Sequence, residues 1–194
     1  MEIVIESLRR FERRLQGETP MSFILWDKQP GGGYRPKEEE RISDALKTHL
    51  EEDLRGKGII ANREVMIRSG TGAQRGERTD VHIDAVTNGS QGGVYDRLTV
   101  IVEVKGSWNR EVREAMRSQL RDRYLRDNAC RHGLYVVGWF LCDQWDDDDY
   151  RKAHTLRLLP SSIHATQRFL EAQAADLSCG GTSLAGLVIN AALR

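Results

Sequence analysis

A run of apolar, mostly β-branched residues at Leu98–Lys105 (LTVIVEVK) constrains the fold of this chain more than any other segment. A near-continuous run of this kind predicts a central strand that is covered on both faces. Because side chains alternate across a strand, Ile101, Glu103 and Lys105 share one face. Burial of an acid or a base alone costs on the order of several kcal/mol, so Glu103 and Lys105 need partners where the strand ends.

The preceding strand, predicted at Thr79–Val86 (TDVHIDAV), carries further polar side chains. Its alternation places Asp80, His82 and Asp84 on one face. The turn sequence NGSQGG separates the two strands, so we expect a hairpin in which Asp80 and Glu103 approach each other. Two carboxylates held that close repel each other unless a cation or a proton lies between them, so we expect removal of Glu103 or Asp80 to leave stability without metal unchanged or higher. Mg²⁺ prefers hard oxygen ligands, so the sequence predicts Mg²⁺, with Mn²⁺ able to substitute, bound by Asp80 and Glu103.

The Lys105 ammonium is expected to point toward the same place as these carboxylates. An ammonium there can assist an attacking water or stabilise the charge that grows on a phosphate. Asp80, Glu103 and Lys105 together favour metal-assisted hydrolysis of a phosphodiester bond. Simpler interpretations stay open, because Glu103 and Lys105 also suit an ordinary ion pair at a sheet edge. Asp84 suits a second metal ligand or a solvent-facing acid, and His82 suits a phosphate contact or a packing residue.

The remaining segments predict an α/β fold. Helices are expected at residues 2–16, 36–54, 109–128 and 161–175, and strands at 63–68, 79–86, 98–105, 134–142 and 184–192. This order implies a central mixed sheet of four to five strands flanked by helices. The Gly- and Pro-rich loop at residues 27–36 divides the chain into an N-terminal helix and linker, residues 1–35, and a main domain, residues 36–194.

Asp80, a hairpin-length gap and then Glu103-Val104-Lys105 inside an apolar strand resemble the D…(D/E)-x-K signature of the PD-(D/E)XK, or restriction-endonuclease-like, nucleases. Thr79 stands where the family often has Pro, which is a common departure. The resemblance covers about residues 38–142. It implies a restriction-endonuclease-like core and Mg²⁺-dependent hydrolysis of DNA, in which Asp80, Glu103 and Lys105 are catalytic.

Residues on two flanking helices extend the resemblance. The family often has a Glu on the helix before the sheet, a position that suits Glu39 better than Glu38. Many members carry a Gln and then a Tyr on the helix after the Lys, and Gln119 and Tyr124 are the matching residues. Apolar spacing along this helix places Gln119 on its inward side, with Met116, Leu120 and Tyr124. The resemblance implies Glu39 and Gln119 as further catalytic residues. The usual Gln-x-x-x-Tyr spacing is one residue shorter, so the role of Tyr124 as a substrate contact stays open.

Several neighbouring residues have two interpretations. Arg113 and Arg117 belong to a row of arginines at helical spacing, which suits a grip on phosphates as well as a solvated face paired with acids. Trp108 suits stacking on a base as well as capping of the core. The acidic run Asp146–Asp149 lacks the spacing of a calcium loop, and we interpret it as the acidic start of a helix.

Charge composition limits the kind of nucleic-acid binding that is expected. The 29 basic and 29 acidic residues cancel, whereas a free-standing nucleic-acid binder is usually basic. Contact with nucleic acid is therefore expected from a local patch, a homodimer or a larger assembly. No apolar run approaches the roughly 20 residues of a membrane span, and the first residues lack the features of a signal peptide. With three isolated cysteines, the sequence predicts a cytoplasmic protein with reduced thiols.

The sequence thus predicts a metal-dependent nuclease that cuts DNA, and the resemblance implies a role in restriction, repair or antiviral defence. Two alternatives remain: a catalytically inactive module of the same fold that binds nucleic acid or a protein partner, and an RNA-specific nuclease. DNA is favoured over RNA, and no membrane partner is expected. Sequence specificity, endo- or exonucleolytic cleavage, the number of metal ions and the oligomeric state stay open.

Overall fold

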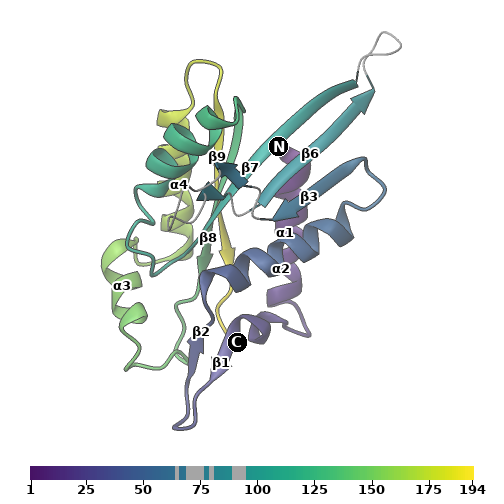
Figure 1. Ribbon diagram of the computed structural model, residues 1–194. Helices are drawn as coiled ribbons and strands as arrows, with labels where there is room; N and C mark the ends of the chain where they lie inside the picture. Colours follow the sequence, from purple (N-terminus) through teal and green to yellow (C-terminus); the bar gives the residue numbers. More distant parts are fainter. Residues whose placement is uncertain (64–65, 69–76, 79–80, 89–94) are drawn as a thin grey trace.

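A five-stranded mixed sheet forms the centre of the protein (Figure 1). The computed structural model describes residues 1–63, 66–68, 77–78, 81–88 and 95–194. The strands, in their order across the sheet, are β3 (Ile59–Arg63), β6 (Val81–Asn88), β7 (Tyr95–Gly106), β8 (His132–Trp139) and β9 (Ser183–Asn190). Pairing is antiparallel from β3 to β7 and parallel from β7 to β9. The expected α/β class, with a mixed sheet flanked by helices, is confirmed.

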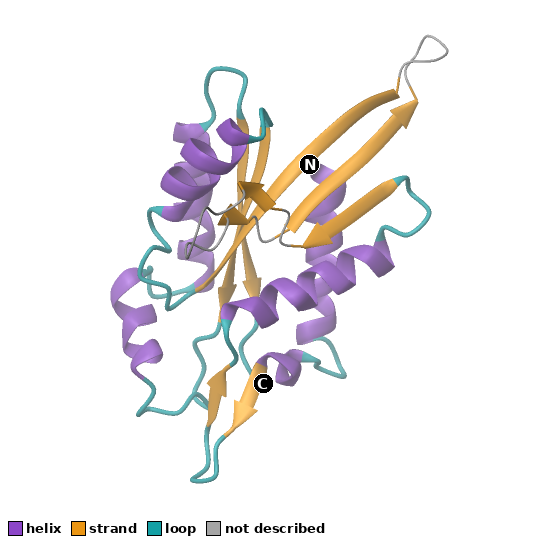
Figure 2. Cartoon of the chain, viewed as in Figure 1, coloured by secondary structure: helices purple, strands orange, loops and turns teal. Residues whose placement is uncertain are grey.

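Helices cover both faces of this sheet, and Figure 2 shows them on either side of the strands. One face carries α1 (Glu2–Gln16) and α2 (Glu39–Asp53), and the other carries η2 (Met116–Leu125) and α4 (Ile163–Leu177). Alternation along β7 supplies a core on each side. Val102 and Val104 pack with α1 and α2, whereas Ile101 packs with η2 and α4.

Smaller elements complete the described chain: η1 (Ser22–Leu25), β1 (Trp26–Lys28), β2 (Tyr34–Pro36), β4 (Met66–Arg68), β5 (Glu77–Arg78) and α3 (Tyr150–Leu158). β1 and β2 pair as antiparallel strands, so the plain loop expected at residues 27–36 is wrong. The chain reverses at Gly32 and Gly33, whose φ angles of 93° and 72° favour glycine. α1 shares its core with β7 and α2, and a domain boundary at residue 35 stays a prediction.

The expected hairpin of two polar-faced strands is present. β6 and β7 pair with Val81 opposite Val102, His82 opposite Ile101 and Asp84 opposite Thr99. β7 pairs with β8 only from Val100 onward, so the far half of the hairpin extends beyond β8 (Figure 1). The side chains of His82 and Asp84, on β6, therefore lie on the same face of the sheet as Glu103, on β7.

Two expected elements differ in their bounds or type. The strand expected at residues 63–68 is divided between the end of β3 and β4. The helix expected at residues 109–128 begins as turns and continues as η2, a π-helix with hydrogen bonds five residues apart. Its predicted inward side chains Met116, Leu120 and Tyr124 are buried. Apolar spacing located the buried side correctly, but a repeat of four residues does not distinguish a π-helix from an α-helix.

No helix within the described ranges is both long and apolar enough to cross a membrane. The three cysteines, Cys130, Cys142 and Cys179, are free thiols. The described chain therefore gains none of its stability from a disulfide.

A buried histidine joins α1 to α2. His49 is 3% exposed, and its Nε2 atom lies 2.8 Å from the Ser7 carbonyl oxygen. A guanidinium nitrogen of Arg14, which can only donate, lies 3.3 Å from Nδ1. Nδ1 therefore accepts a hydrogen bond and Nε2 donates one, which is the neutral tautomer. Burial is the main cause that lowers the pKa of His49.

We expect the free energy of unfolding to decrease as the pH falls below about 6.5, the ordinary pKa of histidine. In that range the unfolded chain protonates His49 while the folded protein keeps it neutral, so protons favour unfolding. The hydrogen bonds from Arg10 hold the pKa of Asp53 well below its usual range. The Asp53 contribution is therefore present above about pH 3.9 and is lost only at lower pH.

Urea denaturation at about pH 7.5 and about pH 5 separates the His49 effect from the Asp53 effect. The variant His49→Gln is expected to lose most of the difference in unfolding free energy between the two pH values. His164→Gln, at an exposed position on α4, is the matched control and should keep it. An equal pH difference in wild type and His49→Gln would contradict this assignment.

Candidate functional site

Glu103 and Lys105 form an ion pair on β7, the middle strand of the sheet. Lys105 Nζ lies 2.6 Å from Glu103 Oε1, and the two side chains are 12% and 2% exposed. β6 pairs on one side of β7 and β8 on the other, with Glu103 opposite Tyr135. The simpler interpretation is right that the two residues pair. It is wrong about the place, because β7 is a central strand and not an edge.

Glu39, the first residue of α2, holds the chain where β7 ends. Its Oε1 atom accepts a hydrogen bond of 2.7 Å from the Gly106 backbone N–H. The Asn109 side-chain amide donates to both carboxylate oxygens at 2.9 Å. Glu39, and not the exposed Glu38, is thus the residue that points to the strand that carries Glu103 and Lys105. Asn109 was not among the predicted site residues. Its position directly after the strand was the one feature that could have indicated its contact with Glu39.

Asp80, the first expected metal ligand, lies outside the described residues. Its neighbour in the sequence, Val81, is opposite Val102, which is the neighbour of Glu103. Asp84 lies further along β6, and its Oδ1 atom accepts a hydrogen bond of 2.6 Å from the Thr99 hydroxyl. Within the described ranges, no group of three or more His, Cys, Asp or Glu side chains is arranged to hold a metal ion. The expected pair of metal ligands therefore stays a prediction.

The residues expected on the following helix lie in different surroundings. Gln119 is half-buried, and its amide donates a hydrogen bond of 2.6 Å to Glu111, on the preceding turns of its own segment. The structure therefore ties Gln119 to its own segment, although we expected it on the inward side. Tyr124 is 7% exposed and belongs to the core beneath η2.

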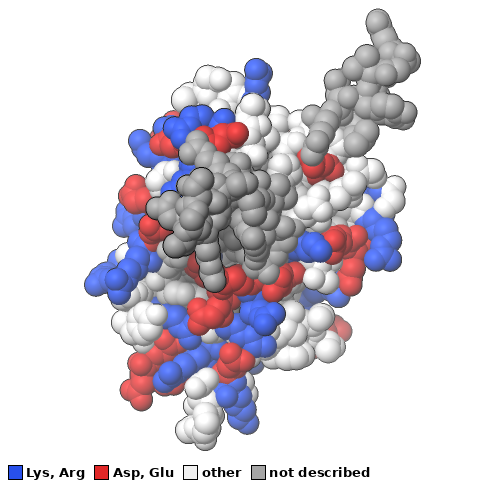
Figure 3. All heavy atoms as spheres, in the orientation of Figure 1, with Lys and Arg blue, Asp and Glu red and all other residues white. Residues whose placement is uncertain are grey.

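The two arginines proposed for phosphate contact are exposed. The Arg113 guanidinium carbon lies 5.0 Å from the centre of the Phe169 ring of α4, in cation–π geometry. Figure 3 shows basic and acidic side chains interspersed over the described part of the face that it draws. This mixture agrees with the zero net charge and with the interpretation of the arginine row as a solvated face.

Trp108 caps the core and does not offer its ring to solvent. It is 7% exposed, and its ring lies edge-on against Phe140 and Trp145, with centroids 4.9 and 6.0 Å apart. A Cβ atom at Gly106 would lie 2.7 Å from the Trp108 ring, so only glycine allows this approach. Of the two interpretations of Trp108, the structure supports capping of the core.

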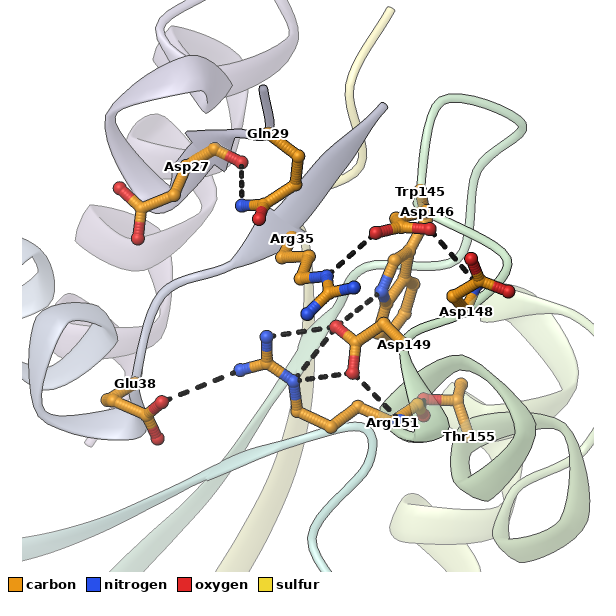
Figure 4. A network of polar contacts seen from close by, with 10 residues as sticks. All are labelled: Asp27, Gln29, Arg35, Glu38, Trp145, Asp146, Asp148, Asp149, Arg151 and Thr155. Carbon is orange, nitrogen blue, oxygen red and sulfur yellow. Dashed lines mark hydrogen bonds and ion pairs between the residues drawn. The ribbon is translucent and has the colours of Figure 1, made fainter. Parts of the chain in front are cut away.

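Figure 4 shows that the acidic run before α3 is occupied by structural contacts. Asp146 accepts a hydrogen bond of 2.7 Å from Arg35, which lowers the pKa of Asp146. Asp149 accepts one from the Trp145 ring N–H at 3.0 Å and caps α3 through the Arg151 backbone N–H at 3.1 Å. The interpretation as the acidic start of a helix is confirmed.

Arg151 connects this acidic run to the start of α2 and is only 9% exposed. Its guanidinium contacts Asp149 at 2.9 Å and Glu38 at 3.7 Å, and it lies 5.3 Å from the centre of the Trp108 ring. Figure 4 shows the arginine reaching across from α3 toward Glu38. The contacts of Arg151 thus hold α3 against the start of α2 and against Trp108, which follows the strand that carries Glu103 and Lys105. Local sequence patterns do not indicate this role, because the contacts join distant segments.

Comparison with known proteins adds no relative to this description. No protein-family model, curated protein or solved structure gives a match to the chain. The functional conclusion therefore depends on the residues and their geometry.

We expect Glu103→Leu to lower the free energy of unfolding by about 3–5 kcal/mol, because it removes the carboxylate that compensates the Lys105 ammonium. From the sequence we expected removal of Glu103 to leave stability unchanged or higher, by relief of repulsion between acids. The observed pairing reverses that expectation. The double variant Glu103→Leu with Lys105→Met should lose less than Glu103→Leu alone.

Urea denaturation of the two single variants and the double variant measures this coupling. The surface pair Lys47–Glu51 on α2, at 2.7 Å and with side chains 29% and 45% exposed, is the matched control. Its coupling should be about 0.5 kcal/mol or less. A coupling between Glu103 and Lys105 as small as that of the control would show that burial adds nothing to their pairing.

Proposed function

We propose that this protein is a metal-dependent nuclease that hydrolyses phosphodiester bonds of DNA. The observation that carries the proposal is the ion pair between Glu103 and Lys105, set into the central strand of an otherwise apolar sheet core. Two apolar side chains of similar size often give a protein the same stability as a buried ion pair. The presence of two charges here therefore needs an explanation other than stability. Hydrolysis of a phosphodiester bond supplies one, because it needs an acidic metal ligand and a cationic group side by side.

In this proposal Asp80 and Glu103 hold Mg²⁺. The antiparallel register supports the assignment. Val81, which follows Asp80 in the sequence, is opposite Val102, which precedes Glu103. One or two carboxylates, completed by water and substrate phosphate, are a usual ligand set for Mg²⁺. When bound, Mg²⁺ lowers the pKa of a coordinated water and neutralises charge on the phosphate.

Lys105 acts on the phosphate in this proposal. Its ammonium is held at Glu103 and keeps some exposure, which leaves it able to meet an anionic substrate. As water adds to phosphorus and the bond to the leaving sugar oxygen breaks, negative charge grows on the phosphate oxygens. The ammonium stabilises that charge, and its fixed position requires little rearrangement during the reaction.

Glu39 has a positioning role in this proposal. Both of its carboxylate oxygens already accept hydrogen bonds from Gly106 or Asn109. These contacts favour an anchor for the strand that carries Glu103 and Lys105 over a role in proton transfer. Asn109→Ala is therefore expected to reduce cleavage less than substitution of Lys105.

Plasmid nicking in the presence of Mg²⁺, with EDTA in a parallel reaction, tests the proposal. Wild type should nick the plasmid only with Mg²⁺, and Lys105→Ala and Glu103→Gln should each lower the rate about 100-fold or more. Lys47→Ala, at a half-buried position on α2 with no part in the proposed hydrolysis, is the control and should retain the wild-type rate.

The result that would overturn the proposal is the absence of metal-dependent cleavage by correctly folded wild-type protein. That result would favour a module of the same fold that only binds nucleic acid or a protein partner. Labelled single-stranded RNA is digested in parallel. If only RNA is cleaved, RNA replaces DNA as the proposed substrate, and the roles of Asp80, Glu103 and Lys105 stay as proposed.

A further inference from the structure

A second polar site lies on the same face of the sheet as Glu103. A cavity of about 430 Å³ opens between the β6–β7 hairpin and the turn that precedes β8. Its walls include His82, Leu98, Thr99, Arg131 and His132. None of these residues has a part in the proposed hydrolysis. The cavity therefore needs an explanation of its own.

His82 is the reason to expect a ligand in this cavity. The residue is 8% exposed, and neither of its ring nitrogens has a hydrogen-bond partner among the described residues. Asp84 Oδ1 lies 3.4 Å from Nε2 but outside hydrogen-bond geometry, and it accepts the Thr99 hydroxyl. A buried polar group without a partner is costly, so native structures rarely keep one.

The needs of the imidazole define the kind of ligand. A neutral imidazole offers one donor and one acceptor. A phosphodiester linkage of a nucleic-acid strand has only acceptor oxygens at neutral pH, so it leaves the acceptor nitrogen without a partner. The edge of a nucleobase presents donors and acceptors together and can satisfy both kinds of nitrogen. Both ring nitrogens are enclosed in this structure, so a base edge meets one of them only after rotation about the last side-chain bond of His82, which has a broad energy profile.

The other walls suit the remaining parts of a nucleotide. Arg131 is exposed and His132 is half-buried, and both border the cavity, where they can donate hydrogen bonds to a phosphate. Leu98 is 37% exposed and offers an apolar surface to a planar base. A volume of about 430 Å³ lies within the range of small-molecule sites. It is larger than an inorganic anion requires.

We propose that this cavity binds one nucleotide unit, with its phosphate at Arg131 and His132 and its base edge at His82. The inference rests on the proposed nuclease function, because the nucleotide belongs to a nucleic-acid strand that is bound at Glu103. His82 is opposite Ile101, two residues before Glu103 on β7. Two residues of a strand span about 7 Å, close to two stacked nucleotide steps. The cavity therefore holds a nucleotide about two steps along the strand from the one that is cut.

NMR spectra of the imidazole nitrogens, recorded on wild-type protein in EDTA, test this inference without cleavage. A nucleoside monophosphate and a short single-stranded oligonucleotide are titrated in separate arms, with inorganic phosphate as a third. The two nucleotide arms should shift the ring resonances of His82 and His132, and those of His154 and His164 should stay. Inorganic phosphate at the same concentration should leave His82 unmoved.

Two results would overturn the inference. His82 resonances that move with neither the monophosphate nor the oligonucleotide at saturating concentration would exclude a nucleotide in the cavity. An equal shift with inorganic phosphate would reduce the site to an anion site. A shift with the monophosphate but not with the oligonucleotide would locate a free nucleotide here and exclude a bound strand.

Binding of a labelled oligonucleotide, followed by fluorescence anisotropy in EDTA, adds a test by substitution. Arg131→Gln should raise the Kd about tenfold, because it removes a charge-assisted contact with phosphate. Arg157→Gln, on the last turn of α3, is the control and should leave the Kd unchanged. An unchanged Kd for Arg131→Gln would remove Arg131 from the site.

The two proposals fail separately. Binding at His82 without metal-dependent cleavage would contradict the nuclease and keep the nucleotide site. Cleavage at the wild-type rate by Arg131→Gln, with His82 resonances unmoved, would contradict the nucleotide site and keep the nuclease.

Discussion

The ion pair between Glu103 and Lys105 is the constraint that the surrounding structure has to meet. Two charges on a central strand lose most of their contact with water, and their attraction offsets that loss only when the geometry is fixed. The chain leaves the sheet at Gly106, one residue after the lysine. This position lets the ammonium keep partial exposure while the carboxylate is buried. The pair therefore lies where the apolar core gives way to polar contacts.

The chain beyond this pair is held from two sides. Glu39 of α2 accepts the Gly106 backbone N–H, and the Ser107 hydroxyl lies 3.1 Å from the Thr155 hydroxyl of α3. The Trp108 ring fills the space above Gly106 and lies beneath the Arg151 guanidinium. Each contact limits the movement of the strand end. A fixed strand end keeps Glu103 and Lys105 in one arrangement, which a catalytic group needs.

The family resemblance indicated that Glu39 points to the sheet. Local patterns in the sequence were enough to predict the central strand, the polar hairpin and the helix that precedes the sheet. These features depend on alternation, turn residues and helix starts, all of which act over a few neighbouring residues. The contacts of Asn109 and Arg151 could not be predicted in the same way, because they join segments that are far apart in the sequence. The inward placement of Gln119 differs for another reason, because its amide pairs with Glu111 in its own segment.

The central claim is that Asp80 and Glu103 share one divalent cation, and binding of Mn²⁺ measured by electron paramagnetic resonance tests it most directly. The account predicts that wild type binds Mn²⁺ and that Asp80→Asn and Glu103→Gln each weaken binding at least about tenfold. Asp44→Asn, at a partly exposed position on α2, should bind as wild type does. Mn²⁺ affinity that is absent in wild type, or unchanged in Asp80→Asn and Glu103→Gln, would contradict the account.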